Sequence, residues 1–215
     1  MKVIIFDTET TGLPPFRTSP NKDNAHEWPY IVQISFIIYD TSLNKLMTTY
    51  DAIVKVPNDV DIPEECTNIH GITKEISLKQ GYDICDVLNI FKTAFENCDI
   101  IVAHNINFDL NMILVETLRN KINVECLFTK TCCCTMLYSK ELCNIKAVSK
   151  SGRTYIKYPS LKELHNKLFE IIPKNLHNSY IDTIICLRCY YYLIYNYDLC
   201  EQNCNFNALY KKFCV

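Results

Sequence analysis

The sequence has no long apolar run, no excess of basic residues and no N-terminal leader pattern. No apolar stretch reaches the ~18 residues that a membrane-spanning helix needs. Lys2 leads into a short apolar run that ends at Asp7 without a small-residue cleavage site, so no signal peptide is predicted. We therefore expect an intracellular protein without a membrane partner. The formal net charge of −2 also argues against binding nucleic acid through a global positive field.

The size and composition predict one folded domain across residues 1–215. Hydrophobic residues make up 48% of the chain and charged residues 21%, which supplies a core and argues against disorder. We find no internal repeat, low-complexity tract or linker in the sequence.

The chain carries 13 cysteines, an odd number that argues against a fully paired disulfide framework. In an intracellular protein these thiols are expected to be reduced. Cys186 and Cys189 form a CxxC pair with Cys200 and Cys204 downstream, which leaves zinc as an alternative. Core burial is favoured instead, because the pair lies in a helical apolar pattern without a Gly or Pro for a zinc-knuckle turn. The cysteine run 132–134 lacks ligand spacing and is assigned to a helix.

Hydrophobic periodicity and turn residues predict an α/β protein. Strands are predicted at 2–7, 30–40, 45–56, 99–105 and 124–128. Helices are predicted within 62–73 and at 82–98, 107–121, 131–139, 160–169, 180–197 and 206–213. The segment 14–29 reads as a loop, and 150–159 as a loop or small hairpin. Three sequential strands followed by alternating strands and helices indicate a mixed sheet with helices packed on it.

Two acidic residues follow the first apolar strand. Asp7 and Glu9 are two positions apart, so strand alternation places both carboxylates on the same side. At ~4 Å and an effective dielectric constant of ~20, their repulsion is roughly 4 kcal/mol. Protonation, a basic partner or a metal must offset it, and the motif contains no Lys or Arg. A divalent cation such as Mg²⁺ or Mn²⁺ is therefore favoured over two acids exposed at a strand end.

A similar arrangement recurs after the fourth predicted strand. His104 and Asn105 follow an apolar run, and Asp109 lies near the start of the next helix. If that strand is parallel to the first and beside it, Asp109 reaches the same sheet end as Asp7. Taken alone, Asp109 is better explained by a favourable interaction with the helix dipole.

His177 and Asp182 are five positions apart, so they can share a site only if His177 precedes the helix that carries Asp182. We predict Ser179 as the N-cap residue, with Asp182 as its capping-box partner. Taken alone, these residues are better explained by a capped helix with a surface histidine.

Taken together, "FDTETTGL", "HGIT", "AHNINFDLNMI" and "HNSYID" resemble the DEDD exonucleases of the histidine subtype, also called DnaQ-like. The resemblance runs from Lys2 to about Leu193. It implies a ribonuclease H-like fold with a mixed five-stranded sheet, in which three antiparallel strands precede parallel ones and helices flank the sheet. It also implies 3′–5′ exonuclease activity that releases nucleoside 5′-monophosphates with two divalent cations.

The resemblance assigns a role to each matching residue. It implies that Asp7, Glu9, Asp109 and Asp182 are metal ligands and that His177 is the general base. An imidazole suits a base that works near neutral pH. The substrate-binding residues that the resemblance implies are Thr8, Thr10, Leu13, Glu65, His70, Asn105 and Phe108.

Two segments look like insertions relative to compact members of that family. Residues 14–29 form a long loop after the first strand. For Trp28 and Tyr30 at its end, core packing is favoured over stacking on bases. Residues 140–159 lie in the basic region 139–176, whose eight bases and three acids give a local charge of +5. That region is either a nucleic-acid contact or a solvated surface.

The expected partner is nucleic acid with a free 3′ end, with single-stranded DNA favoured over RNA. A polymerase chain is a further expected partner if the role is proofreading, because no polymerase domain is seen in the sequence. An exoribonuclease is the alternative function. A nucleic-acid-binding module on an inactive nuclease fold is less favoured, because all five expected catalytic positions are filled.

Overall fold

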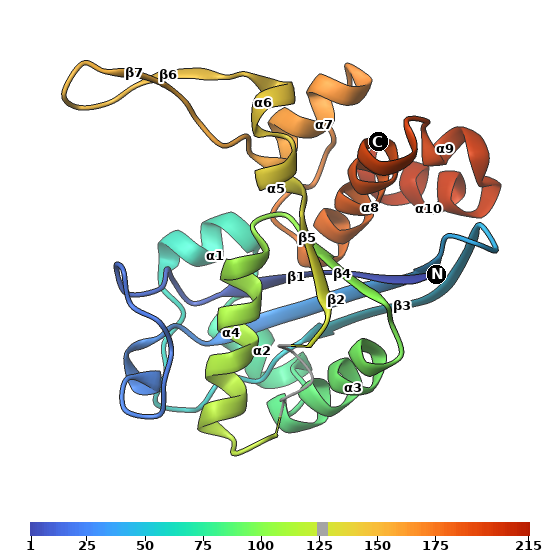
Figure 1. Ribbon diagram of the computed structural model, residues 1–215. Coiled ribbons are helices and arrows are strands. Elements are labelled where there is room, and N and C mark those ends of the chain that lie inside the picture. Colours follow the sequence, from blue (N-terminus) through green and yellow to red (C-terminus); the bar gives the residue numbers. More distant parts are fainter. Residues whose placement is uncertain (124–128) are drawn as a thin grey trace.

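The computed structural model describes residues 1–123 and 129–215, and it centres on a five-stranded sheet (Figure 1). Its strands are β1 (Lys2–Thr10), β2 (Ile31–Asp40), β3 (Lys45–Ile53), β4 (Ile100–Ala103) and β5 (Thr131–Cys134). They lie in the order β3-β2-β1-β4-β5, with β1, β2 and β3 antiparallel and β4 parallel to both β1 and β5. The predicted mixed sheet is confirmed.

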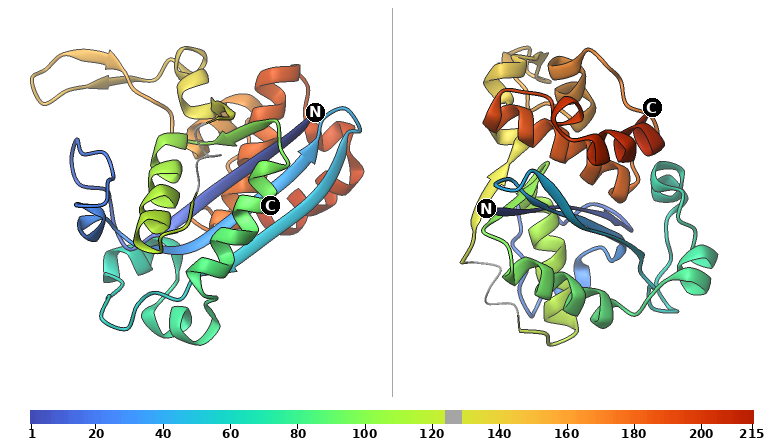
Figure 2. Two further views of the ribbon diagram at one scale, coloured as in Figure 1. Left: turned by 60° about the horizontal axis from the view of Figure 1, so that its bottom comes forward. Right: turned by 90° about the vertical axis from the view of Figure 1, so that its right-hand side faces the viewer.

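Helices cover both faces of the sheet, and a separate small hairpin between α6 and α7 projects away from it (Figure 2). The helices are α1 (Glu64–His70), α2 (Lys74–Gln80), α3 (Ile84–Glu96), α4 (Ile106–Arg119), α5 (Thr135–Tyr138), α6 (Lys140–Cys143), α7 (Leu161–Phe169), α8 (Ser179–Tyr195), α9 (Leu199–Gln202) and α10 (Cys204–Cys214). The hairpin consists of β6 (Lys146–Val148) and β7 (Thr154–Ile156). Within the described ranges, no helix combines the length and apolarity needed to cross a membrane.

The central strand β1 is buried on both faces, and its alternating side chains define two cores. Ile4 and Phe6 pack toward α3 and α4, where the rings of Phe6 and Phe91 lie 5.2 Å apart. Val3 and Ile5 pack on the opposite face against α8. Asp7 and Glu9 continue the series of Val3 and Ile5, so the sequence directs both carboxylates toward α8.

One predicted helix was wrong. Residues 131–134 form the edge strand β5, which pairs in parallel with Ile100–Ala103 of β4, and only the following α5 is helical. A run of one threonine and three cysteines carries no helical periodicity, and its pairing with β4 decides its conformation. The strand predicted at 124–128 lies outside the described residues. Cys186 and Cys189 lie on α8 and are buried in the core between this helix and the sheet, as favoured.

The loop that follows β1 is closed at its neck and clamped from α4. The Thr11 N–H donates to the Tyr30 carbonyl over 2.9 Å, and the Tyr30 N–H donates to Thr11 Oγ1 over 2.9 Å. Arg119 donates to the carbonyls of Ala25, Trp28 and Pro29 and lies over the Tyr30 ring, 3.8 Å from its centroid.

Trp28 is 2% exposed and belongs to the core between the sheet, α3 and α4, so packing is confirmed over base stacking for this residue. Glu116 completes the clamp, because its Oε1 accepts from Arg119 Nη1 over 2.8 Å and from the Ile31 N–H over 3.2 Å. This ion pair is almost fully buried, with side chains 13% and 3% exposed.

Replacing Arg119 tests whether this clamp holds the loop. Arg119→Ala should lower the free energy of unfolding by ~3–5 kcal/mol, because it leaves the buried Glu116 carboxylate and three carbonyls without their donor. Arg119→Lys should restore only part of the loss, since an ammonium group lacks the planar fork. Urea denaturation measures both variants.

Lys79→Ala is the matched control, because Lys79 pairs with Glu75 at 2.6 Å with both side chains more than 70% exposed. Its loss should stay below about 1 kcal/mol. Equal losses for Arg119→Ala and Lys79→Ala would contradict the clamp.

Candidate active site

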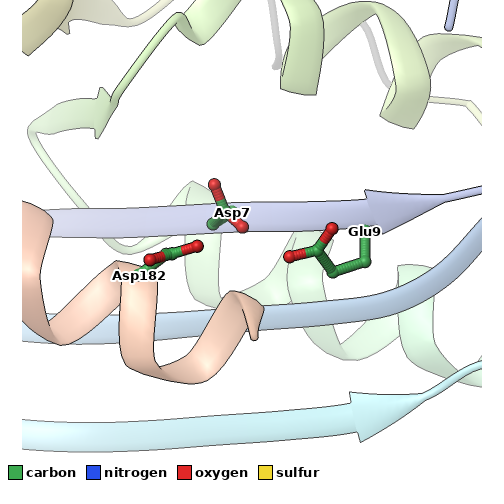
Figure 3. Close-up of side chains that lie close together, drawn as sticks. All are labelled: Asp7, Glu9 and Asp182. Carbon is green, nitrogen blue, oxygen red and sulfur yellow. The ribbon is translucent and has the colours of Figure 1, made fainter. Parts of the chain in front are cut away.

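Three acidic side chains from two elements converge beside the central strand. Asp7 and Glu9 come from β1 and Asp182 from the first turn of α8, and one carboxylate oxygen of each lies within 4.8 Å of the others. Figure 3 shows Asp7 and Glu9 on one side of β1, with Asp182 reaching toward them from the helix. Among the residues that the structure describes, this is the one group with a metal-binding arrangement, and the cysteines form no such group.

Asp109 approaches the cluster from α4 and stays outside the 4.8 Å group. Its Oδ1 accepts from the Thr8 N–H over 3.0 Å and from Thr8 Oγ1 over 2.9 Å. The parallel pairing of β1 with β4 brings it there, as predicted. Thr8 is therefore buried and occupied with orienting Asp109, whereas the resemblance implied a substrate contact for it.

A polar network fixes the start of α8 over β2. Ser35 Oγ donates to Asp51 Oδ1 over 2.8 Å, so the 2.6 Å contact with Ser179 Oγ has Ser179 as donor. Gln33 Nε2 also donates to Asp51, and Gln33 Oε1 accepts from the Ser179 N–H. Ser35 and Gln33 are paired with Asp7 and Glu9 across β1 and β2. The network therefore sets the height of Asp182 above the two β1 carboxylates.

Sequence reasoning missed this network, although the polar Gln33 and Ser35 within an apolar strand were its signal. It also misplaced the helix cap. Asn178 is the N-cap residue, with Oδ1 accepting from the N–H groups of Tyr180 and Ile181, and Ser179 is the first helical residue. The reason is that Ser179 is already committed to Ser35. Asp182 consequently makes no capping box, and its Oδ2 accepts from the His177 N–H over 3.0 Å.

His177 lies in the loop before α8, as predicted, with a left-handed backbone (φ 68°). Its side chain is exposed. Within the described ranges its ring has no hydrogen-bond partner, so the main-chain N–H provides its link to the carboxylates.

The charged forms of the clustered carboxylates are unfavourable in the folded protein. Burial, followed by repulsion from Asp182 and Asp109, raises the pKa of Glu9 to about 8. Burial raises the pKa of Asp109 and of Asp182 to about 7, although Thr8 and the His177 N–H act in the opposite direction. Burial and the three neighbouring carboxylates raise the pKa of Asp7 well above its usual range.

The residues present fit a divalent cation. Asp182 Oδ1 is buried and, among the described residues, has no hydrogen-bond partner. Such an orphaned oxygen faces an acidic group that lacks a Lys or Arg ion pair in the described part of the chain. Oxygen-only ligand sets are typical of Mg²⁺ and Mn²⁺.

The residues that the resemblance implied for substrate binding fall into two groups. Thr10 and His70 are buried, with Thr10 Oγ1 donating to the Gly12 carbonyl over 2.7 Å and His70 Nδ1 accepting from the Ile72 N–H over 3.1 Å. The Thr10 hydroxyl therefore shapes the turn after β1 and His70 Nδ1 the end of α1, whereas His70 Nε2 is buried without a hydrogen-bond partner among the described residues.

The other group remains open to solvent. Leu13 is 86% exposed, Glu65 is exposed on α1, and Asn105 is exposed at the start of α4. Phe108 is half-buried in the first turn of α4. A β-bulge adds Val32 of β2 opposite the step from Glu9 to Thr10 and lets β1 bend there.

Comparison with known proteins identifies an exonuclease family and a bacterial polymerase of similar sequence. The exonuclease family model (RNase T) matches residues 4–190. The PolC-type DNA polymerase III of Mycoplasmopsis pulmonis (strain UAB CTIP) is 26% identical over 122 residues, which cover 57% of this chain and 7% of the polymerase.

Solved structures show the same fold. E. coli exonuclease I in complex with a dT13 oligonucleotide superposes with a TM-score of 0.66 at 15% identity, over 89% of this chain and 41% of that one. Exonuclease I of Methylocaldum szegediense gives 0.62 at 18% identity, over 89% and 40%. This chain thus spans about two fifths of those proteins and a small fraction of the polymerase.

The raised pKa values predict how the metal-free protein responds to pH. A folded state with raised carboxyl pKa values binds more protons than the unfolded state, so the stability that these groups contribute is greatest in acid and falls from about pH 4 to about pH 8. Each carboxyl that is protonated in the folded state but ionised in the unfolded state lowers the free energy of unfolding by about 1.4 kcal/mol per pH unit. Unfolding measured with EDTA should show the decline, and Mg²⁺ should reverse it.

Glu9→Gln should flatten the pH profile in EDTA and weaken the response to Mg²⁺. Asp59→Asn, at an exposed position, is the control and should behave like the unmodified protein. If Glu9→Gln and Asp59→Asn give the same profile with and without Mg²⁺, the carboxylate cluster is not the source of the effect.

Proposed function

The chain belongs to the exonuclease family whose model spans residues 4–190, and from this membership we propose that it removes nucleotides stepwise from the 3′ end of single-stranded DNA. One observation carries the proposal: Asp7, Glu9 and Asp182 converge at the end of the central strand, with Asp109 held beside them. Structural neighbours that were solved with dT13 and dA16 oligonucleotides support single-stranded DNA as the substrate. The polymerase relative supports a polymerase chain as a further partner.

The chemistry follows from the donor set. Asp7, Glu9 and Asp182, joined by Asp109, would hold two divalent cations, Mg²⁺ or Mn²⁺. When bound, these cations activate water and neutralise the charge that develops on the scissile phosphate. The chain itself contributes the rigid β1 carboxylates, the Thr8 contact that orients Asp109 and the N–H bond that orients Asp182.

We assign His177 as the general base that takes the proton of the attacking water. Its loop position before α8 ties its backbone to Asp182 while its ring stays free to meet a bound strand. The expected products are a nucleoside 5′-monophosphate and a strand that is shorter by one nucleotide. The proposed contacts for the terminal nucleotides are the exposed Leu13, Glu65 and Asn105 and the half-buried Phe108.

A degradation assay tests this function. End-labelled single-stranded DNA and RNA, with free and blocked 3′ ends, are incubated with Mg²⁺, Mn²⁺ or EDTA. Stepwise shortening of DNA from free 3′ ends alone, lost with EDTA, is expected. Cleavage of a 3′-blocked or circular strand contradicts the exonuclease, and faster shortening of RNA makes the protein an exoribonuclease.

Two substitutions separate metal binding from proton transfer. Asp7→Ala should lower kcat about a thousandfold, since several kcal/mol of charge stabilisation are lost and each 1.36 kcal/mol is tenfold. His177→Asn should lower kcat by about 10²–10⁴-fold while Mn²⁺ affinity is retained.

Asparagine is chosen at position 177 because it tolerates the left-handed backbone that alanine disfavours. His177→Gly is the matched backbone control and should be as inactive as His177→Asn. Activity close to that of the unmodified protein in both variants contradicts the assignment of His177 as the base.

A further inference from the structure

The hairpin of β6 and β7 forms an arm, residues 145–158, which stands apart from the five-stranded sheet (Figures 1 and 2). Its ladder extends beyond the two strands, because the Lys157 N–H donates to the Ile145 carbonyl and the Ser149 N–H to the Arg153 carbonyl, both over 2.9 Å. Gly152 adopts φ 77° in the connecting turn. A two-stranded hairpin has little stability by itself, so the contacts at the base of the arm matter for its position.

One strand of the arm alternates cations with an aromatic ring. Arg153, Tyr155 and Lys157 are two positions apart along the extended ladder, so their side chains leave the same face. Tyr155 is 50% exposed, and Arg153 is exposed as well. A cation, a ring and a cation along one face match the repeating phosphates and bases of a single strand.

The charge of the arm is of one sign. Five bases and no acid lie between Glu141 and Glu163, in a chain whose net charge is −2. Lys157 forms an ion pair with Glu163, with Nζ 2.6 Å from Oε1. Lys146, Lys150 and Arg153 have no ion pair among the residues that the structure describes. A polyanion is therefore attracted to this part of an otherwise acidic molecule.

The base of the arm is fixed to the sheet end that carries the carboxylates. His104, directly after β4, contacts the Pro159 carbonyl through Nε2 and Thr135 Oγ1 through Nδ1, each over 3.0 Å. Lys140 Nζ lies 4.9 Å from the centroid of the Tyr158 ring. In Figure 1 the arm projects on the same side as the carboxyl end of β1 and the loop that follows it.

We propose that the arm is a docking surface for the phosphate backbone and bases of single-stranded DNA, away from the 3′ terminus held at the carboxylates. Lys150 and Arg153 contact phosphates, and Tyr155 stacks on a base. This inference rests on the proposed function, because it takes the same strand as the substrate of the carboxylate site.

The test measures binding, so that it is separable from catalysis. All variants are made in an Asp7→Asn background, which leaves the oligonucleotide intact, and the affinity for dT oligonucleotides of increasing length is measured by fluorescence anisotropy. Lys150→Glu with Arg153→Glu should weaken binding of long strands about tenfold and reduce the slope of log K against log salt by about 1.4. Tyr155→Ala should weaken it about tenfold, and Tyr155→Phe should retain the affinity.

Lys45→Glu with Lys211→Glu is the control for net charge, because both lysines are exposed and lie on β3 and α10, away from the arm. It should bind as the parent does. Equal affinities of the parent and the arm variant, or equal losses in the arm and control variants, overturn the docking surface. A loss confined to RNA oligonucleotides overturns DNA as its occupant.

The two proposals fail in different ways. If the unmodified protein degrades DNA, the Asp7→Asn parent binds the oligonucleotide and the arm substitutions have no effect, only the docking surface on the arm is refuted. Absence of both DNA binding and degradation refutes the proposed function. Thermal unfolding of each variant verifies that the fold is retained.

Discussion

The repulsion among buried carboxylates at the end of β1 is the constraint on which the site depends. Burial and mutual charge raise the pKa of Asp7, Glu9, Asp109 and Asp182, so the fold holds these groups against their electrostatic preference. A strand packed on both faces can bear this cost, because the hydrophobic contacts of β1 fix its backbone. A divalent cation that binds among these carboxylates offsets their repulsion, and its binding free energy stabilises the folded state.

The arrangement of strands in the sheet determines where each carboxylate of the site lies. Alternation along β1 sends Asp7 and Glu9 toward α8, and the parallel neighbour β4 delivers Asp109 from the opposite face. The Asp51 network then seats α8 on β2. Each carboxylate is thus positioned by a separate hydrogen bond or strand register. This explains how side chains far apart in sequence meet within a few ångströms.

Sequence reasoning succeeded where one local rule decides the outcome, and failed where tertiary contacts do. Asp7, Glu9 and the loop position of His177 follow from strand alternation and helix geometry. The N-cap residue of α8 could not be predicted, because Ser179 has two available partners and the sequence does not reveal that Ser35 is one of them. The strand β5, with its run of cysteines, could not be predicted either, since only its pairing with β4 makes it extended. The arm was visible as a basic segment, but its alternating face appeared only with the hairpin register.

Charge is distributed so that one nearly neutral chain can serve a polyanion. The carboxylates require cations at the point of chemistry, while the arm carries its positive charge elsewhere on the surface. Anomalous diffraction from crystals grown with Mn²⁺ tests the central claim most directly. We expect anomalous density within coordination distance of Asp7, Glu9 and Asp182, and its loss in Asp7→Asn. Mn²⁺ bound only elsewhere, or unchanged density in Asp7→Asn, would contradict it.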